Sequence, residues 1–258
     1  MQIIQSLTLT DMAERVERIC AVVEGRFLAG QAAATAAVEV TTNGVSELLG
    51  PAPLVEALET LFQVLLRFES DWQSQRHSIS TEELSELGDQ GQQLLDDLLQ
   101  WHQQLKIKEG AAALRDLAVP FSLWLVEHGA RLVQLETLVN QLAEIANSSR
   151  DPAALAELDS VVSTLIDGID GNAQGELDNS NPQRPWRVLL LNHAIVATRT
   201  LDPERITAAF DRLVKYLPDD APAFFTQGMG QLDSVGYPDP VRDIMERYYL
   251  MWNTSTLH

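Results

Sequence analysis

The sequence has a single cysteine and no long apolar run. Cys20 has no second cysteine to pair with, which excludes an internal disulfide and indicates a reducing compartment. No stretch approaches the roughly 18 consecutive apolar residues that a membrane span needs. The N-terminal stretch, MQIIQSLTLTDM, lacks the basic start and the apolar core of a secretory signal. We therefore expect a cytoplasmic protein that does not bind or cross a membrane.

Basic residues are also few. The chain has 18 Lys and Arg against 37 Asp and Glu, a formal net charge of −19. Nucleic acids and anionic lipid surfaces are bound by clustered Lys and Arg, so neither is an expected partner. A protein partner that presents a basic patch suits this charge better.

Histidines and reactive motifs are equally sparse. The five histidines are His77, His102, His128, His193 and His258. No two of them are four residues apart, the spacing of a helical metal site, and none has a cysteine partner. Neither the Gly-x-Ser-x-Gly motif of hydrolases nor a phosphate-binding loop occurs. The sequence therefore predicts no metal, no cofactor and no catalytic residue, and it favours a protein that is not an enzyme.

Apolar residues, in contrast, recur at helical spacing. One run is Leu54, Leu58, Leu61, Leu65, Phe68 and Trp72, and a second is Leu84, Leu87, Gly91, Leu94, Leu98, Trp101 and Leu105. Intervals of three and four place each run on one face of a helix. Ser80 and Glu83 match a capping box, which predicts a helix start between the runs. We expect an all-α fold without a sheet, in which antiparallel helical hairpins stack as a bundle or a short α-solenoid.

Gly88 and Gly91 lie three residues apart in the second run. Glycine destabilises a helix interior, so its presence there needs a reason. A close crossing with another helix would be one such reason.

A segment rich in Asn, Gly and Asp separates two regions of different composition. Residues 1–180 carry 10 Lys and Arg against 28 Asp and Glu, whereas residues 181–258 carry 8 against 9. Nine of the 16 aromatic residues lie in the second region. We therefore predict an acidic helical unit over residues 1–169, a loop or linker over 170–185 and an aromatic helical unit over 186–258.

Two sets of residues are candidates for binding a protein partner. The first set is acidic and lies off the apolar seam of the predicted helix: Glu82, Glu86 and Asp89. The second set has the residue types that are enriched at interface hot spots: Arg187, Tyr237, Tyr248, Tyr249 and Trp252. Because Tyr248 and Tyr249 are adjacent on one helix, they cannot both face inward.

The segment from Ile206 to about Tyr248 carries a family resemblance. Its matching residues are Phe210, Pro218, Phe224, Gly228 and Gln231. In this order it resembles part of a tetratricopeptide repeat, with Phe224 and Gln231 in place of the usual Trp and Tyr. The resemblance implies a helical hairpin and protein recognition on a concave face. The alternative is a generic three-helix cap with similar residues at its helix ends.

These observations lead to one main hypothesis and two alternatives. The main hypothesis is a non-enzymatic interaction protein, an adaptor or an assembly chaperone. The first alternative is a helical ligand-binding or enzymatic bundle with a pocket near His128 and His193, which Trp124 and Arg187 would help to line. Homo-oligomerisation through spare apolar stripes is compatible with both.

Overall fold

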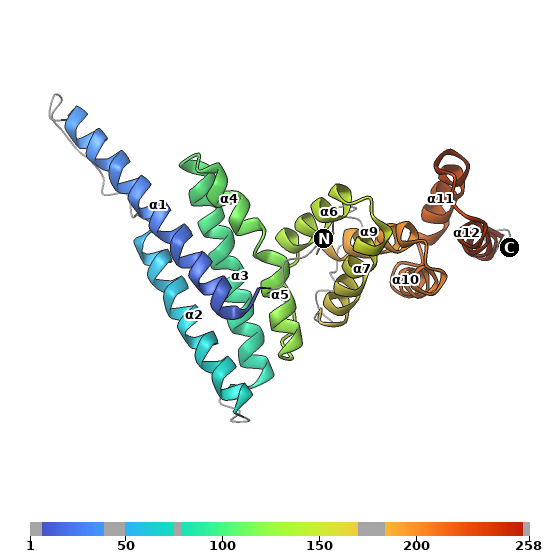
Figure 1. Ribbon diagram of the computed structural model, residues 1–258, viewed down its shortest axis with the longest axis horizontal. Coiled ribbons are helices and arrows are strands. Elements are labelled where there is room, and N and C mark those ends of the chain that lie inside the picture. Colours follow the sequence, from blue (N-terminus) through green and yellow to red (C-terminus); the bar gives the residue numbers. More distant parts are fainter. Residues whose placement is uncertain (1–6, 39–49, 75–78, 170–183, 255–258) are drawn as a thin grey trace. The chain divides into compact units, whose positions relative to one another are not determined.

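A computed structural model describes residues 7–38, 50–74, 79–169 and 184–254 (Figure 1). These residues form an all-α structure without a β-strand, as the spacing of the apolar residues predicted. The helices, in chain order, are α1 (Leu9–Val38), α2 (Ala52–Gln73), α3 (Thr81–Gln104), α4 (Lys108–Arg115), α5 (Ala118–Glu127), α6 (Glu136–Ser148), α7 (Pro152–Asp167), α9 (Pro185–Thr200), α10 (Pro203–Tyr216), α11 (Ala221–Val235) and α12 (Asp239–Thr254). None of these helices is both long and apolar enough to cross a membrane.

Several helices begin at a residue whose side chain caps the first turn. At α3 the Glu83 amide donates to the Ser80 hydroxyl at 3.2 Å, and the Ser80 amide donates to the Glu83 carboxylate at 2.8 Å. This reciprocal pair is the predicted capping box. Asp151 caps α7 and Asp202 caps α10, and each precedes a proline in the first turn. Helix starts are thus specified by neighbouring residues.

The described residues fall into two compact units. The first unit ends at Gln141 and the second begins at Leu142, so the division falls within α6. This differs from the division at 170–185 that the sequence suggested. Residues 170–183 of that predicted linker lie outside the described residues. The helices on its two sides, α7 and α9, pack against each other within the second unit.

The first unit is built around α3, which packs against α1, α2, α4 and α5. Its α2 and α3 form the predicted hairpin and lie alongside each other (Figure 1). A Cβ atom on Gly88 would lie 2.9 Å from a methyl carbon of Leu125, and one on Gly91 would lie 2.9 Å from both Leu61 and Phe121. Both glycines therefore allow a close helix crossing.

The sole cysteine belongs to this first unit. Cys20 lies on α1 and is 1 % exposed. Burial, with smaller contributions from the charges of Glu59 and Glu24, raises the pKa of the Cys20 thiol to about 12. The thiol is therefore protonated at neutral pH.

The second unit has an aromatic core. The rings of Phe210, Phe225 and Tyr248 have centroids 5.1 to 5.3 Å apart. Gly228 of α11 faces Met245 of α12 so closely that a Cβ atom would lie 2.6 Å from the sulfur. The segment that resembles a tetratricopeptide repeat consists of α10, α11 and part of α12. Its helices are present, and the repeat resemblance itself stays a prediction.

The structural division changes how the charge is shared. Residues 5–141 carry 9 Lys and Arg against 20 Asp and Glu, and residues 142–258 carry 9 against 17. The two units therefore have net charges of −11 and −8. The contrast seen along the sequence at residue 180 is not a contrast between the compact units, because the acidic α7 belongs with the arginine-bearing helices.

Candidate functional site

The two histidines of the ligand-binding alternative lie in different units. His128 follows α5 in the first unit, where its Nδ1 lies 2.7 Å from the carbonyl oxygen of Trp124. Its ring packs on the Trp124 ring with a centroid separation of 4.4 Å. His193 lies on α9 in the second unit and is 4 % exposed. Neither histidine lines any of the three pockets described below.

His193 belongs to a buried ionic network. Asp159 Oδ1 lies 3.1 Å from His193 Nε2, and Asp159 Oδ2 accepts a hydrogen bond from Arg205 at 2.8 Å. Burial raises the pKa of Asp159, but the contacts with His193 and Arg205 lower it by more, so the pKa lies below its usual value. These three residues come from α9, α7 and α10. The network therefore joins three helices of the second unit.

The predicted partner-binding residues of the second unit differ in their exposure. Arg187 is half-buried and pairs with Asp220 at 2.6 Å. Tyr248 is buried in the aromatic core and donates to the Asp211 carboxylate. Tyr249, on the adjacent position, is half-buried, which agrees with the expectation that both cannot face inward.

The other two residues of that set are half-buried as well. Tyr237 lines a small pocket of about 120 Å³ next to Phe224 and Met245. The indole N–H of Trp252 is buried and has no hydrogen-bond acceptor among the described residues. Tyr237 and Trp252 are thus accessible in part, and their role as contacts for a partner stays a prediction.

The predicted acidic residues of α3 lie away from its buried seam. Glu82 and Glu86 are exposed, whereas Asp89 is half-buried. Helical geometry places Glu86 next to a strip formed by Glu83, Gln90 and Asp97, which follow one another at intervals of seven residues. Asp89 lies between Glu86 and the flank that carries Gln92 and Asp96. Gln90 lines one cavity, and Gln92 and Asp96 line another.

An open groove of about 440 Å³ runs between α2 and α3. Its floor is formed by Leu61, Val64, Leu87 and Leu94, of which Val64 is 37 % exposed. Exposed polar side chains, Glu56 of α2 and Gln90 of α3, stand along its edges. Glu56 is the acidic residue among those that line the groove, and the two helices together carry ten Asp and Glu, with Arg67 as their one Lys or Arg. We call this feature the acidic groove.

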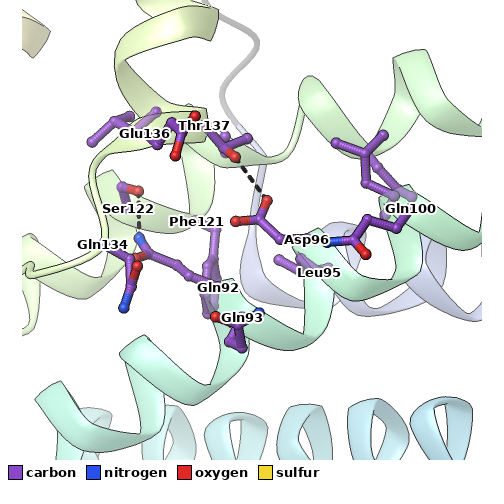
Figure 2. A pocket seen from close by; sticks show the side chains of 14 residues that line it. Gln92, Gln93, Leu95, Asp96, Gln100, Phe121, Ser122, Gln134, Glu136 and Thr137 are labelled. Carbon is purple, nitrogen blue, oxygen red and sulfur yellow. Dashed lines mark hydrogen bonds between the residues drawn. The ribbon is translucent and has the colours of Figure 1, made fainter. Parts of the chain in front are cut away.

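A second cavity of about 240 Å³, here called the polar pocket, lies between α3, α5 and the start of α6 (Figure 2). Gln92 and Asp96 project from α3 toward it. Gln92 Nε2 donates to the Ser122 hydroxyl of α5 at 3.0 Å, and the Thr137 hydroxyl of α6 donates to Asp96 at 2.7 Å. Two polar side chains one helical turn apart are thus held in place by two other segments.

The polar pocket contains acceptors that the protein leaves partly unsatisfied. Gln92 Oε1 is buried and has no hydrogen-bond partner among the described residues. Burial raises the pKa of Asp96, the hydrogen bond from Thr137 opposes this, and the charges of Glu136 and Asp97 add to the rise. The net result is a pKa above the usual value. The Asp96 carboxylate therefore lies where negative charge is disfavoured.

Sequence reasoning missed the four residues that define the polar pocket: Gln92, Asp96, Ser122 and Thr137. They come from three segments and match no motif. The only available signal was that Gln92 and Asp96 are four residues apart and flank the apolar seam of α3. The same spacing is typical of a solvated helix face, so the sequence alone gave no reason to single them out.

Comparison with known proteins adds nothing to this geometry. No known protein family, no characterised protein and no solved structure matches the chain. Within the part of the chain that the structure describes, no three His, Cys, Asp or Glu side chains gather in a way that could hold a metal ion. The acidic groove and the polar pocket are therefore the two features of the described residues that can indicate a function.

Proposed function

We propose that the protein is a non-enzymatic interaction protein, an adaptor or assembly chaperone, whose acidic groove receives an amphipathic basic helix of a protein partner. The observation that carries the proposal is an apolar groove, lined also by the carboxylate of Glu56, between two helices that together carry ten Asp and Glu. A helix with apolar residues on one face and Lys or Arg beside them complements both features.

The floor has the spacing that a third helix needs. Leu87 and Leu94 are seven residues apart on α3, two turns of a helix, and both are half-buried. Val64 stands opposite them on α2 and is partly exposed. Apolar side chains at positions i, i+3 or i+4, and i+7 of a partner helix would meet these residues and remove them from water.

Carboxylates near the groove would favour a partner helix that carries positive charge. Glu83 lies one heptad before Gln90 on α3, and Asp97 lies one heptad after it. Glu56 of α2 lines the groove opposite Gln90. Carboxylates at the rim of an interface attract a basic partner over about 8 Å at physiological salt. Charge reversal at Glu86, which extends this strip, should slow association and weaken its salt dependence. Contacts by Glu82, Asp89, Arg187 and the C-terminal aromatic residues remain further predictions.

Designed peptides test the proposal without a known partner. A Leu/Lys peptide with leucines at i, i+3, i+4 and i+7 should bind the full chain in fluorescence anisotropy. A peptide of the same composition in scrambled order, and a Leu/Glu version of the first, should not. Val64→Lys places a cation on the groove floor and should weaken binding at least about tenfold, since an unpaired charge is costly at an apolar contact. Val133→Lys is the matched control, because Val133 is 44 % exposed in the same unit and lies outside the groove.

Two results would overturn the proposal. Equal binding of the ordered and scrambled peptides would show only charge attraction to an acidic protein. A homodimer in light scattering that Val64→Lys dissociates would mean that a second copy of the chain, and not a partner, covers the groove.

A further inference from the structure

The polar pocket differs from the acidic groove in being built around fixed hydrogen-bond acceptors. The amide of Gln92 is held through its nitrogen by Ser122, which is 1 % exposed. In this arrangement Oε1 is buried and has no hydrogen-bond partner among the described residues. A buried acceptor without a partner is costly, so the site favours a molecule that donates to it.

Asp96 provides the second acceptor. Thr137 is its only hydrogen-bond donor in the described part of the chain, which leaves acceptor capacity on the carboxylate. Side chains four residues apart on a helix are neighbours, with Cβ atoms about 6 Å apart. Both side chains line the same cavity, so a group with several N–H donors that enters it lies near both. Figure 2 shows the two side chains on the same face of α3.

The remainder of the pocket sets the size and polarity of its occupant. Leu95, Leu99, Leu114 and Phe121 line it together with the polar side chains. An apolar cavity of about 150 Å³ accommodates benzene. A cavity of about 240 Å³ therefore has room for a chain somewhat longer than that ring. The occupant should be a short apolar chain that ends in a donor group.

Charge decides the nature of that donor. Asp96 and Glu136 both line the pocket, and no Lys or Arg does. A neutral donor would leave the carboxylate of Asp96 uncompensated, whereas a cation would neutralise it. An ammonium carries three donors and a guanidinium five, and neither accepts hydrogen bonds.

We propose that the polar pocket binds a primary ammonium or guanidinium group carried on a short apolar chain, held by Asp96 and the Oε1 atom of Gln92. This role is independent of the acidic groove. Two sources present this chemistry: a free small amine, or the side chain of a lysine or arginine in another polypeptide. Glu136 at the pocket edge adds to the attraction without defining the site.

Three probes test the site on the full chain by titration calorimetry at about 0.15 M salt, where distant charges are screened. They are pentylamine, the neutral 1-pentanol of equal length, and Nα-acetyl-lysine methylamide. Pentylamine or the lysine derivative should bind, and 1-pentanol should bind at least about tenfold more weakly, as expected for the loss of a charged hydrogen bond. The tighter of the two cations identifies the source.

Matched variants locate the binding. Asp96→Asn keeps the shape of the side chain and removes its charge, so it should weaken amine binding about tenfold or more. Ala118→Leu fills the pocket from α5 while every carboxylate stays in place, and it should also prevent binding. Glu127→Gln removes one exposed charge from the same unit outside the pocket, and it should leave the affinity unchanged.

The proposal is overturned if 1-pentanol binds as well as the amines, or if no probe binds, which would leave a pocket filled by water only. It is equally overturned if Glu127→Gln weakens binding as much as Asp96→Asn, because the amines would then be general counterions of an acidic protein. Thermal melting of each variant shows whether it is folded. Since the acidic-groove peptides are measured separately, failure here leaves that proposal untouched.

Discussion

The two units bury polar side chains in different ways, and two histidines show the difference. His102 of the first unit is fully buried, and its ring nitrogens have no hydrogen-bond partner of normal geometry in the described residues. Burial lowers the pKa of His102, and backbone groups of Ile19 and Ile107 oppose this in part. His193 of the second unit lies 3.1 Å from a buried aspartate that also binds an arginine. The first unit disfavours the charged form of its histidine through burial, whereas the second places a buried carboxylate beside its histidine.

The same difference extends to the acidic residues. In the second unit, Asp159 and Asp167 of α7 pair with Arg205 and Arg212 of α10. In the first unit, Glu83, Glu86 and Asp97 of α3 have no Lys or Arg partner among the described residues; Glu83 and Glu86 are exposed, and Asp97 is half-buried.

 Carboxylates of α7 therefore bind arginines within the second unit, whereas Glu83 and Glu86 of α3 lie at the surface of the first. Similar net charges can thus contribute to cohesion in one unit and stay at the surface in the other.

The sharpest way to test this comparison is to cut the chain between α7 and α9. A protease site inserted in the 170–183 segment should give two products that still elute together from a sizing column. We expect this because α7 packs against α9 and is joined to α10 by the Asp159 network. The same sample in strong denaturant should separate, which shows that cleavage was complete. Separate elution without denaturant would instead support a division at the predicted linker.

Removal of the buried aspartate should have the next largest effect. Asp159→Ala leaves His193 and Arg205 without their shared partner and should cost about 3–5 kcal/mol of unfolding free energy. Asp167→Ala is the matched control, because the Asp167 side chain is 67 % exposed and its pair with Arg212 should contribute less than about 1 kcal/mol. Urea unfolding followed by circular dichroism measures both.

The Asp159 network also predicts a pH dependence. The pKa of Asp159 is lower in the folded than in the unfolded state. The contribution of Asp159 to the unfolding free energy is therefore fully present above the unfolded pKa near 3.8. It is lost as the pH falls through the folded pKa. The destabilisation by Asp159→Ala should therefore shrink in acid below about pH 4. A constant difference down to pH 2 would contradict the charged network.

A cavity made in the core of the first unit should lower the unfolding free energy by a comparable amount, with no contribution from charge. Leu98 is 0 % exposed on α3, so Leu98→Ala should cost about 2–5 kcal/mol. This loss should not change between pH 7 and about pH 3, whereas the loss caused by Asp159→Ala should shrink below about pH 4. The measurement is urea unfolding at both pH values. A loss below about 1 kcal/mol would show that the α3 seam is not the core of the first unit.

A smaller effect is expected at the close helix crossing. Gly91→Ala adds a methyl group 2.9 Å from Leu61 and Phe121, so the neighbours must move, at a cost of about 1–3 kcal/mol. Gly25→Ala on α1 is the control, because a Cβ atom there meets nothing within 4 Å. That variant should be neutral or slightly stabilising, since alanine is the better helix former. Equal effects at both positions would mean that α3 does not cross its neighbours closely.

The smallest effect should be a gain in stability at the polar pocket. The pKa of Asp96 is raised in the folded state, so its charged form opposes folding once the pH exceeds the unfolded pKa. Asp96→Asn should therefore stabilise the first unit at pH 7, and the gain should vanish near pH 3. Thermal melting at several pH values measures this. A loss of stability at pH 7 would mean that the carboxylate supports the fold and not a ligand.

The sequence predicted the local features of this fold well. Ser80 and Glu83, or Asp151 before Pro152, specify helix starts through residues that are close in the chain. The all-α class followed from the same short-range spacing. Gly91 could be interpreted because a glycine inside a helix demands a close neighbour, and the structure confirms one.

The division of the chain and the polar pocket were beyond local reasoning. The pair formed by Asp159 and Arg205 joins residues 46 positions apart, and no pattern near either residue indicates it. Composition alone therefore drew the boundary where the sequence changes and not where the contacts are few. Gln92, Ser122 and Thr137 likewise meet only after three segments have packed.

The buried thiol of Cys20 provides a way to measure how often the first unit opens. Only the thiolate reacts readily with disulfide reagents, and a protonated thiol inside α1 is protected until the helix opens. Because the chain has no other cysteine, the rate of labelling reports opening events of this unit alone. Ligands that fill the groove or the pocket should slow that rate. Occupancy of either site can therefore be measured as slower labelling of Cys20.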